Sequence, residues 1–176
     1  MRKTTAAAGS LTHFVLQPGV VAGLIPWWLT GWRLRQPLSS WAWAPLRLAG
    51  GILLVAGAVI LVRAFVWFVG EGSGTPAPIA PTQRLVVGGP YRYVRNPMYL
   101  AVTAVIVGQA LVLGQPGLLV YAAVVSVAMA VFAHGYEEPT LRRQFGAQYE
   151  AYRRAVPPWW PRRRPWQPGQ DTFLPT

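Results

Sequence analysis

The sequence predicts an all-α integral membrane protein with about four transmembrane helices, the last two forming a helical hairpin, and a C-terminal amphipathic helix. Two observations support this fold class. Hydrophobic residues make up 53% of the chain and charged residues only 12%, whereas soluble domains average roughly 25% charged residues. Long uncharged runs also alternate with short segments rich in Arg and Trp, which is the pattern found at bilayer surfaces. With 176 residues, the chain is expected to form a single domain, residues 1–176.

The charge balance is strongly basic, with 16 Lys and Arg against 5 Asp and Glu. Because the basic residues lie in the gaps between apolar runs, they read as membrane topology signals, and a nucleic-acid partner is not expected. The chain has no cysteine, which excludes disulfides and thiolate metal sites, and no metal is expected.

The first expected span covers residues 14–30, within a run from residue 4 to residue 32 that has no Asp, Glu, Lys or Arg. Pro18 and Pro26 are expected to kink it. No small-residue cleavage site follows the basic start of the chain, so we expect this run to be retained rather than removed as a signal peptide. A connection at head-group level is expected to follow, containing Arg33, Arg35, Trp41, Trp43 and Arg47.

The second expected span covers residues 48–70 and is apolar except for Arg63. Two interpretations of Arg63 remain open. It is either a buried cation that binds an acidic group, or an arginine near the end of the span whose side chain extends to the head groups.

Residues 70–96 form a long segment rich in Gly and Pro, which we interpret as a lid or wall of a site. Gly70, Gly72 and Gly74 do not form a dinucleotide-binding fingerprint, because that motif needs a strand before it and a helix after it.

The next uncharged run, residues 96–136, is about twice as long as one span. A turn at residues 114–117, Gly-Gln-Pro-Gly, divides it into spans at 97–113 and 116–133. Both ends of such a hairpin return to the same membrane face. The hairpin therefore predicts that residues 92–99 lie beside residues 134–138.

Residues 137–156 are expected to form one amphipathic helix with an apolar face and a basic face. The apolar positions follow helical spacing: Leu141, Phe145, Tyr149, Tyr152 and Val156. Such a helix suits a membrane surface that bears anionic lipid. The Trp- and Arg-rich stretch 157–164 is interpreted as a further head-group anchor.

The distribution of basic residues gives an orientation. With four spans, twelve basic residues lie on the side of the termini and the central loop, and three lie on the other side. The positive-inside rule then predicts a multi-pass protein of the cell membrane with both termini in the cytoplasm.

Two polar groups stand out at the ends of the hairpin. Residues 88–99 gather Tyr, Arg and Asn side chains at the mouth of a span, where polar groups are costly without a purpose. Glu137 and Glu138 are two of only five acids in the chain. They are read either as part of a site or as acids that stabilise the start of a helix at Pro139.

Residues 85–158 resemble the isoprenylcysteine carboxyl methyltransferase and phospholipid methyltransferase family of integral-membrane enzymes. The matching blocks are Gly89-Pro90-Tyr91, Arg95-Asn96-Pro97 with Tyr99, Glu137-Glu138, Phe145-Gly146, Tyr149, Tyr152 and Val156-Pro157. The resemblance implies methyl transfer from S-adenosyl-L-methionine to a lipophilic acceptor, either the carboxylate of a prenylated or lipid-like molecule or the amine of a phospholipid head group.

The resemblance also implies the site residues. Cofactor binding is expected from Gly89, Pro90, Tyr91, Arg95, Asn96, Pro97, Tyr99, Glu137 and Glu138. Catalytic roles are expected for Arg95, Asn96 and His134, of which His134 is a candidate base. Two departures matter. Asn96 stands where many relatives have His, and Ala133 and His134 stand where the eukaryotic prenylcysteine enzymes have an Arg, which disfavours a prenylcysteine acceptor.

Two other functions fit part of the pattern. A membrane-embedded NADPH-dependent reductase of the sterol type would share aromatic and Asn-Pro motifs, although such reductases usually have more spans. A non-enzymatic protein would use the Tyr and Arg cluster only to bind lipid head groups. A stripe of small residues in the third span, Ala101, Ala104 and Gly108, is read either as a helix contact or as a groove for an acceptor.

Overall fold

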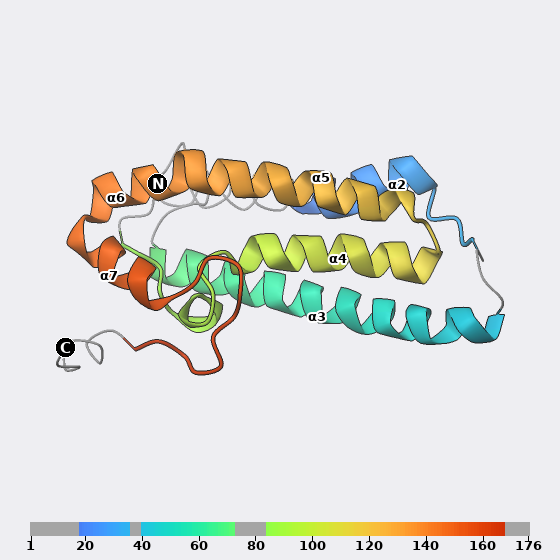
Figure 1. Ribbon diagram of the computed structural model, residues 1–176, viewed down its shortest axis with the longest axis horizontal. Helices are drawn as coiled ribbons and strands as arrows, with labels where there is room; N and C mark the ends of the chain where they lie inside the picture. Colours follow the sequence, from blue (N-terminus) through green and yellow to red (C-terminus); the bar gives the residue numbers. More distant parts are fainter. Residues whose placement is uncertain (1–17, 36–39, 73–83, 168–176) are drawn as a thin grey trace, which may run out of the picture.

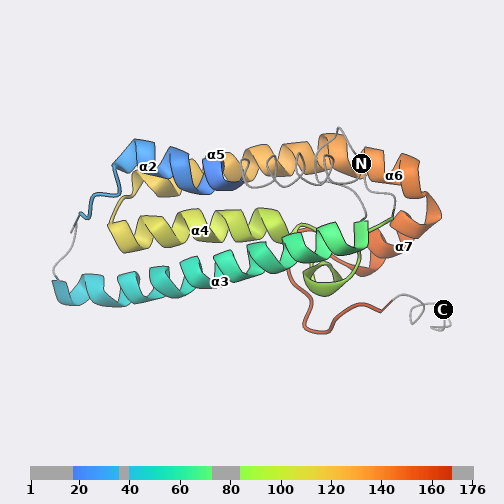
Figure 2. The ribbon, with the colours of Figure 1, turned by 180° about the vertical axis from the view of Figure 1, so that it is seen from behind.

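The computed structural model describes residues 18–35, 40–72 and 84–167, and within these ranges the chain is helical and contains no strand. Three long helices, α3 (Ser40–Gly72), α4 (Pro97–Leu113) and α5 (Gly117–Phe132), run side by side (Figures 1 and 2). The short helices α6 (Glu138–Phe145) and α7 (Ala147–Ala155) lie at one end of this bundle, and the turn between α4 and α5 lies at the other (Figure 1).

The first apolar segment contains a π-helical turn, η1 (Val20–Leu24), followed by α2 (Ile25–Thr30). Pro26 has no N–H to donate to the preceding turn, and the wider turn before it accommodates the proline. Gly31, in the left-handed region at φ 58°, ends the helix. Residues 14–17 of the expected first span lie outside the described residues.

Helix α3 begins earlier than the expected second span. Trp41, Trp43 and Arg47 lie in its first turns rather than in a connection, so that expectation was wrong. Trp43 is buried, and the Arg47 Nε donates to the Val112 carbonyl oxygen at 3.2 Å. These contacts with the far end of the hairpin hold the first turns of α3 in place.

The expected hairpin is present, because α4 ends at Leu113 and α5 starts at Gly117. Gly114 ends α4 in the left-handed conformation at φ 69°, where the absence of a Cβ removes the steric penalty. The Gln115 Nε2 donates to the Arg33 carbonyl oxygen at 2.8 Å, which fixes the turn to the segment after α2.

Helices α3 and α4 contact each other closely through small residues. A Cβ at Gly57 would meet the Ala104 Cβ at 3.1 Å, and a Cβ at Gly108 would meet the Gly50 carbonyl oxygen at 2.8 Å. The stripe of small residues on α4 is therefore a helix contact, and its interpretation as a groove was wrong.

The outer faces of α3 and α5 are apolar. Among the described residues, two helices, Trp41–Glu71 and Gly117–Phe145, are long and apolar enough to cross a membrane, while Val20–Thr30 and Pro97–Leu113 are shorter apolar helices. The exposed side chains of α3 and α5 include Val55, Val59, Val62, Val66, Val120, Val124, Val127 and Val131. Such surfaces fit contact with lipid, whereas the number of spans stays a prediction.

Arg63 lies on the outer side of α3 and is exposed. The interpretation of Arg63 as a buried cation is therefore wrong. The other interpretation, in which the Arg63 side chain extends to the head groups, stays a prediction.

The C-terminal amphipathic helix is broken into two. A π-helical turn, η3 (Ala133–Glu137), leads from α5 into α6, and Gly146 at φ 51° separates α6 from α7. The apolar face packs against Leu85 and Trp166 of the same chain. Because that face is covered by protein, the expectation that it contacts a membrane surface was wrong.

Candidate active site

The polar residues of interest gather where α4 begins and α5 ends, beside α6 and α7 (Figure 1). Residues 84–96 and the segment after α7 complete this end of the bundle. Residues 73–83, part of the expected lid, lie outside the described residues, while Leu85 and Val86 are buried in hydrophobic clusters.

Arg95 is the centre of the polar cluster. Its Nη1 donates to the Glu138 Oε1 at 3.0 Å and to the Tyr149 hydroxyl oxygen at 3.1 Å. The side chain is only 9% exposed, and its Nε is buried without a hydrogen-bond partner. A buried guanidinium donor without an acceptor is costly, so this atom marks a place where a ligand oxygen would be stabilising.

Glu137 has a different partner from its neighbour. The Tyr99 hydroxyl donates to the Glu137 Oε1 at 2.6 Å. Glu137 ends the π-helical turn and Glu138 begins α6. The hairpin thus brings both acids beside the first turn of α4, as the sequence predicts.

Asn96 and Arg95 hold the segment that follows α7. The Asn96 Nδ2 donates to the Pro158 carbonyl oxygen at 3.3 Å, and the Arg95 backbone N–H donates to the Pro157 carbonyl oxygen at 3.0 Å. The Arg162 N–H donates to the Tyr93 carbonyl oxygen at 2.9 Å further along. These bonds fold the C-terminal segment over the start of α4.

This folding places Trp159 beside two other rings. Its ring centroid lies 6.4 Å from that of Tyr99 and 6.2 Å from that of His134, with planes inclined by 25° and 22°. His134 is exposed, and its Nδ1 lies 2.9 Å from the Ala130 carbonyl oxygen. Because a carbonyl oxygen only accepts, Nδ1 carries the hydrogen and Nε2 is the basic nitrogen of the neutral ring.

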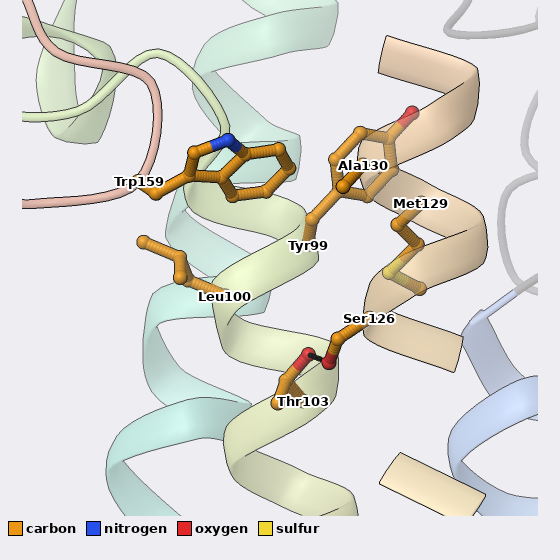
Figure 3. A pocket seen from close by; sticks show the side chains of 7 residues that line it. All are labelled: Tyr99, Leu100, Thr103, Ser126, Met129, Ala130 and Trp159. Carbon is orange, nitrogen blue, oxygen red and sulfur yellow. Dashed lines mark hydrogen bonds between the residues drawn. The ribbon is translucent and has the colours of Figure 1, made fainter. Parts of the chain in front are cut away.

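A cavity of about 250 Å³ lies between α4 and α5 next to this aromatic group (Figure 3). Tyr99 and Trp159 stand at one end of it, and a hydrogen bond of 2.9 Å between the Thr103 and Ser126 hydroxyl groups stands at the other. Its remaining lining is mainly apolar, from Leu100, Met129 and Ala130.

The other expected residues lie beside this cluster. Gly89 and Pro90 begin the 3₁₀ turn η2 (Gly89–Arg92), and Gly89 packs against the Trp67 ring. Tyr91 is buried next to Ala64 and Val86, and its carbonyl oxygen accepts from the Tyr152 hydroxyl at 2.7 Å. Pro97 is the buried first residue of α4.

The tyrosines near Arg95 are held neutral. Burial raises the pKa of Tyr91 and of Tyr152. Burial also raises the pKa of Tyr149, although the Arg95 charge opposes this shift. Neutral hydroxyls keep their hydrogens and remain available as donors.

Two contributors were not assigned to the site from the sequence. Tyr149 was placed on a face toward lipid and Trp159 in a head-group anchor, yet Tyr149 contacts Arg95 and Trp159 contacts Tyr99. Tyr149 belongs to the blocks shared with the family, which was a usable signal. Nothing in the local pattern around Trp159 distinguishes it from Trp160.

Within residues 18–35, 40–72 and 84–167, no group of three or more His, Cys, Asp and Glu residues is arranged to hold a metal ion. The side chains at the cluster supply carboxylates, a guanidinium, an imidazole and aromatic rings.

Comparison with models of known protein families gives a match over the middle of the chain. The model of the phospholipid methyltransferase family matches residues 46–148, which is more than half of the chain. No curated protein and no solved structure matches the chain. The matched range contains α4, α5, Arg95, Glu137 and Glu138, and the chain therefore belongs to the phospholipid methyltransferase family.

Proposed function

We propose that the protein transfers a methyl group from S-adenosyl-L-methionine to a lipophilic acceptor within the membrane. The observation that carries this proposal is that Tyr99, which lines an apolar cavity between α4 and α5, also donates to Glu137, next to the largely buried Arg95–Glu138 pair. Family membership supports a methyltransferase over the sterol-type reductase.

The residues present fit the chemistry of the cofactor. Its carboxylate suits Arg95, whose buried Nε lacks an acceptor. Its ammonium group or ribose hydroxyls suit Glu137 and Glu138, and its sulfonium cation suits the faces of Tyr99 and Trp159. When bound, the cofactor supplies an electrophilic methyl group.

The protein's own residues orient the reactants and exclude water. Arg95 and Glu138 hold each other in one geometry while buried, which limits reorganisation during the reaction. Asn96 acts through Pro158 and thereby positions Trp159. We assign Asn96 a positioning role, while Arg95 remains a candidate for direct contact with the cofactor.

The acceptor determines whether a base is needed. A carboxylate reacts without one, whereas an amine must first lose a proton. The His134 Nε2 is the candidate that accepts this proton, because Nδ1 is fixed as a donor toward the Ala130 carbonyl oxygen.

We assign the apolar part of the acceptor to the cavity between α4 and α5. Its lining of Leu100, Met129 and Ala130 suits a hydrocarbon chain. Tyr99 and Trp159 belong both to this cavity and to the polar cluster. An acceptor in the cavity would therefore have its polar end beside the cofactor residues.

Calorimetry of the purified full-length protein with S-adenosylhomocysteine tests the proposal, with NADPH as the parallel ligand. Methyl transfer predicts saturable binding of S-adenosylhomocysteine alone. Binding of NADPH alone would indicate the reductase, and binding of neither ligand would indicate a protein that only contacts head groups. Labelled S-adenosyl-L-methionine added to membranes, followed by identification of the labelled lipid, identifies the acceptor.

A further inference from the structure

Two hydroxyl groups line the cavity between α4 and α5, although the rest of its lining is mainly apolar (Figure 3). They belong to Thr103 of α4 and Ser126 of α5, and their oxygens lie 2.9 Å apart. Hydroxyl groups in an apolar environment are costly unless they are hydrogen-bonded. The bond between them removes part of this cost, but a helix contact alone does not require that the pair border a cavity.

The partners of Ser126 determine where the two hydroxyl hydrogens lie. The Ser126 Oγ donates to the Ala122 carbonyl oxygen at 2.7 Å, and a carbonyl oxygen can only accept. Because Ser126 has a single hydrogen, the bond between the two hydroxyl groups is donated by Thr103. Both lone pairs of the Thr103 Oγ1 are then left, and among the described residues no side chain donates to them. Thr103 therefore presents a hydrogen-bond acceptor at the cavity wall.

The ligand group that fits this acceptor has a hydrogen to donate but no charge. Among the described residues that line the cavity there is no carboxylate, so an ammonium group would be buried without a counter-charge. An amide would bring a carbonyl oxygen, for which neither hydroxyl group has a hydrogen left. A hydroxyl group is satisfied by donating, and the cavity therefore favours an acceptor chain with a hydroxyl substituent.

The spacing along α4 determines where on the chain this substituent lies. Tyr99 donates to Glu137 in the polar cluster, and Thr103 follows four residues later in the same helix, about 6 Å further along its axis. An extended chain covers at most about 3.6 Å in three bonds, so roughly five bonds span this distance. When the reacting end of the acceptor lies beside Tyr99, a hydroxyl group at that separation lies beside Thr103.

We propose that Thr103 is a specificity-determining residue, which selects a methyl acceptor with an uncharged hydroxyl group about five bonds from its reacting end. This inference rests on the methyl transfer proposed above. The hydroxyl group of the acceptor donates to the Thr103 Oγ1, while Ser126 keeps the Thr103 hydrogen directed away from the ligand. An unsubstituted chain fills the same cavity but leaves the Thr103 oxygen unused.

The first test compares ligands on the full chain purified in a neutral sugar detergent. Calorimetry measures the affinities of dodecanoate and of its 6-hydroxy and 12-hydroxy forms. The corresponding dodecylamines are measured in parallel, because the acceptor is either a carboxylate or an amine. The parent protein should bind the 6-hydroxy ligand roughly three- to tenfold more tightly than Thr103→Val does. The other two ligands should bind both proteins equally. Comparing two proteins for each ligand cancels the partition of that ligand into detergent.

Ser126→Ala separates selection of the acceptor from helix packing. It removes the bond between the two hydroxyl groups, as Thr103→Val does, but it leaves the Thr103 oxygen in place. Thermal unfolding measures the effect of losing this bond on stability in both variants. Only Thr103→Val should lose the preference for the 6-hydroxy ligand. Thr103→Ser retains a hydroxyl group and should retain the preference.

Three results would overturn this proposal. The 6-hydroxy and 12-hydroxy ligands have the same composition, so equal affinities of the parent protein for both would overturn it without any variant. Equal binding of the 6-hydroxy ligand by the parent protein and Thr103→Val would also do so. If Ser126→Ala and Thr103→Val lose the preference equally, the pair serves only as a helix contact.

S-adenosylhomocysteine binding is measured in the same preparations to separate this inference from the proposed function. Failure of the parent protein to bind S-adenosylhomocysteine counts against the proposed methyl transfer. A parent protein that binds S-adenosylhomocysteine but does not prefer the 6-hydroxy ligand counts only against the role of Thr103.

Discussion

Glu137 and Glu138 are neighbours in the chain with different partners, because one accepts from Tyr99 and the other pairs with Arg95. Glu138 also stands in the first turn of α6, where an acid stabilises the helix. The two readings of the acidic pair are therefore compatible in structure, and cofactor affinity separates them.

At the residue scale, Glu138→Gln should weaken S-adenosylhomocysteine binding while leaving the fold intact. The substitution removes a charge-assisted hydrogen bond from a buried arginine, which typically costs about 1.5–3 kcal/mol, or roughly tenfold to a hundredfold in affinity. Calorimetry measures the affinity, and thermal unfolding monitors the fold.

Glu150→Gln is the matched control for this substitution. Glu150 pairs with Arg142 and Arg153 on the surface of the protein, where ion pairs contribute little. If Glu138→Gln binds the ligand as tightly as Glu150→Gln and the parent protein do, Glu138 serves only the helix start.

Trp159 and Trp160 provide a second comparison, because they are adjacent but differ in environment. Trp159 stacks with Tyr99 and with His134, whereas Trp160 is 80% exposed. Trp159→Leu should weaken S-adenosylhomocysteine binding by roughly three- to tenfold, since an aromatic contact contributes about 0.5–1.5 kcal/mol. Trp160→Leu should leave it unchanged. Equal affinities in the two variants would remove Trp159 from the site.

These residues also show what the sequence predicted at this scale. The proximity of Arg95 and Glu138 was predicted, because acids are rare in this chain and a hairpin between the two residues returns to one face. Trp159 was not found, because its ring partners are distant in sequence and a run of Trp, Pro and Arg equally fits a membrane surface.

At the scale of elements, the contact between α3 and α4 depends on glycine. A Cβ at Gly108 would lie 2.8 Å from both the Gly50 carbonyl oxygen and the Leu54 Cβ. Gly108→Ala should therefore lower the free energy of unfolding by about 1–3 kcal/mol. Thermal or denaturant unfolding in detergent checks this value.

Gly51→Ala is the control for that contact, because nothing lies within 4 Å of a Cβ at Gly51 in the interior of α3. This substitution should stabilise the helix by about 0.5–1 kcal/mol. A Gly108→Ala variant as stable as Gly51→Ala would mean that the two helices do not approach so closely.

Helix boundaries were predictable where the chain contains strong signals. Pro97 and the turn at Gly114 predicted the limits that α4 has in the structure. The break at Gly146 was not predictable, because one glycine is tolerated in a helix and the apolar spacing continues across it. The early start of α3 was also missed, because Trp and Arg residues that contact the hairpin resemble those of an interfacial connection.

At the scale of the whole molecule, the orientation is a prediction from twelve basic residues against three. Reporter fusions after Trp32, Gly74, Pro116 and Thr176 should read outside, inside, outside and inside. A signal from outside at Gly74 would contradict both the orientation and the access of a cytosolic cofactor to the site.

The last prediction concerns the path of the acceptor. Ala130 lines the cavity between α4 and α5, whereas Ala128 is exposed on the same helix. Ala130→Leu should fill part of the cavity and slow methylation of a long-chain acceptor more than that of a short soluble analogue. S-adenosylhomocysteine affinity should be unchanged, because the cofactor contacts assigned to Arg95 and Glu138 do not involve Ala130. Ala128→Leu should leave both rates unchanged. If Ala130→Leu slows both acceptors equally, the cavity does not hold the acceptor chain, which must then approach along another face of the bundle.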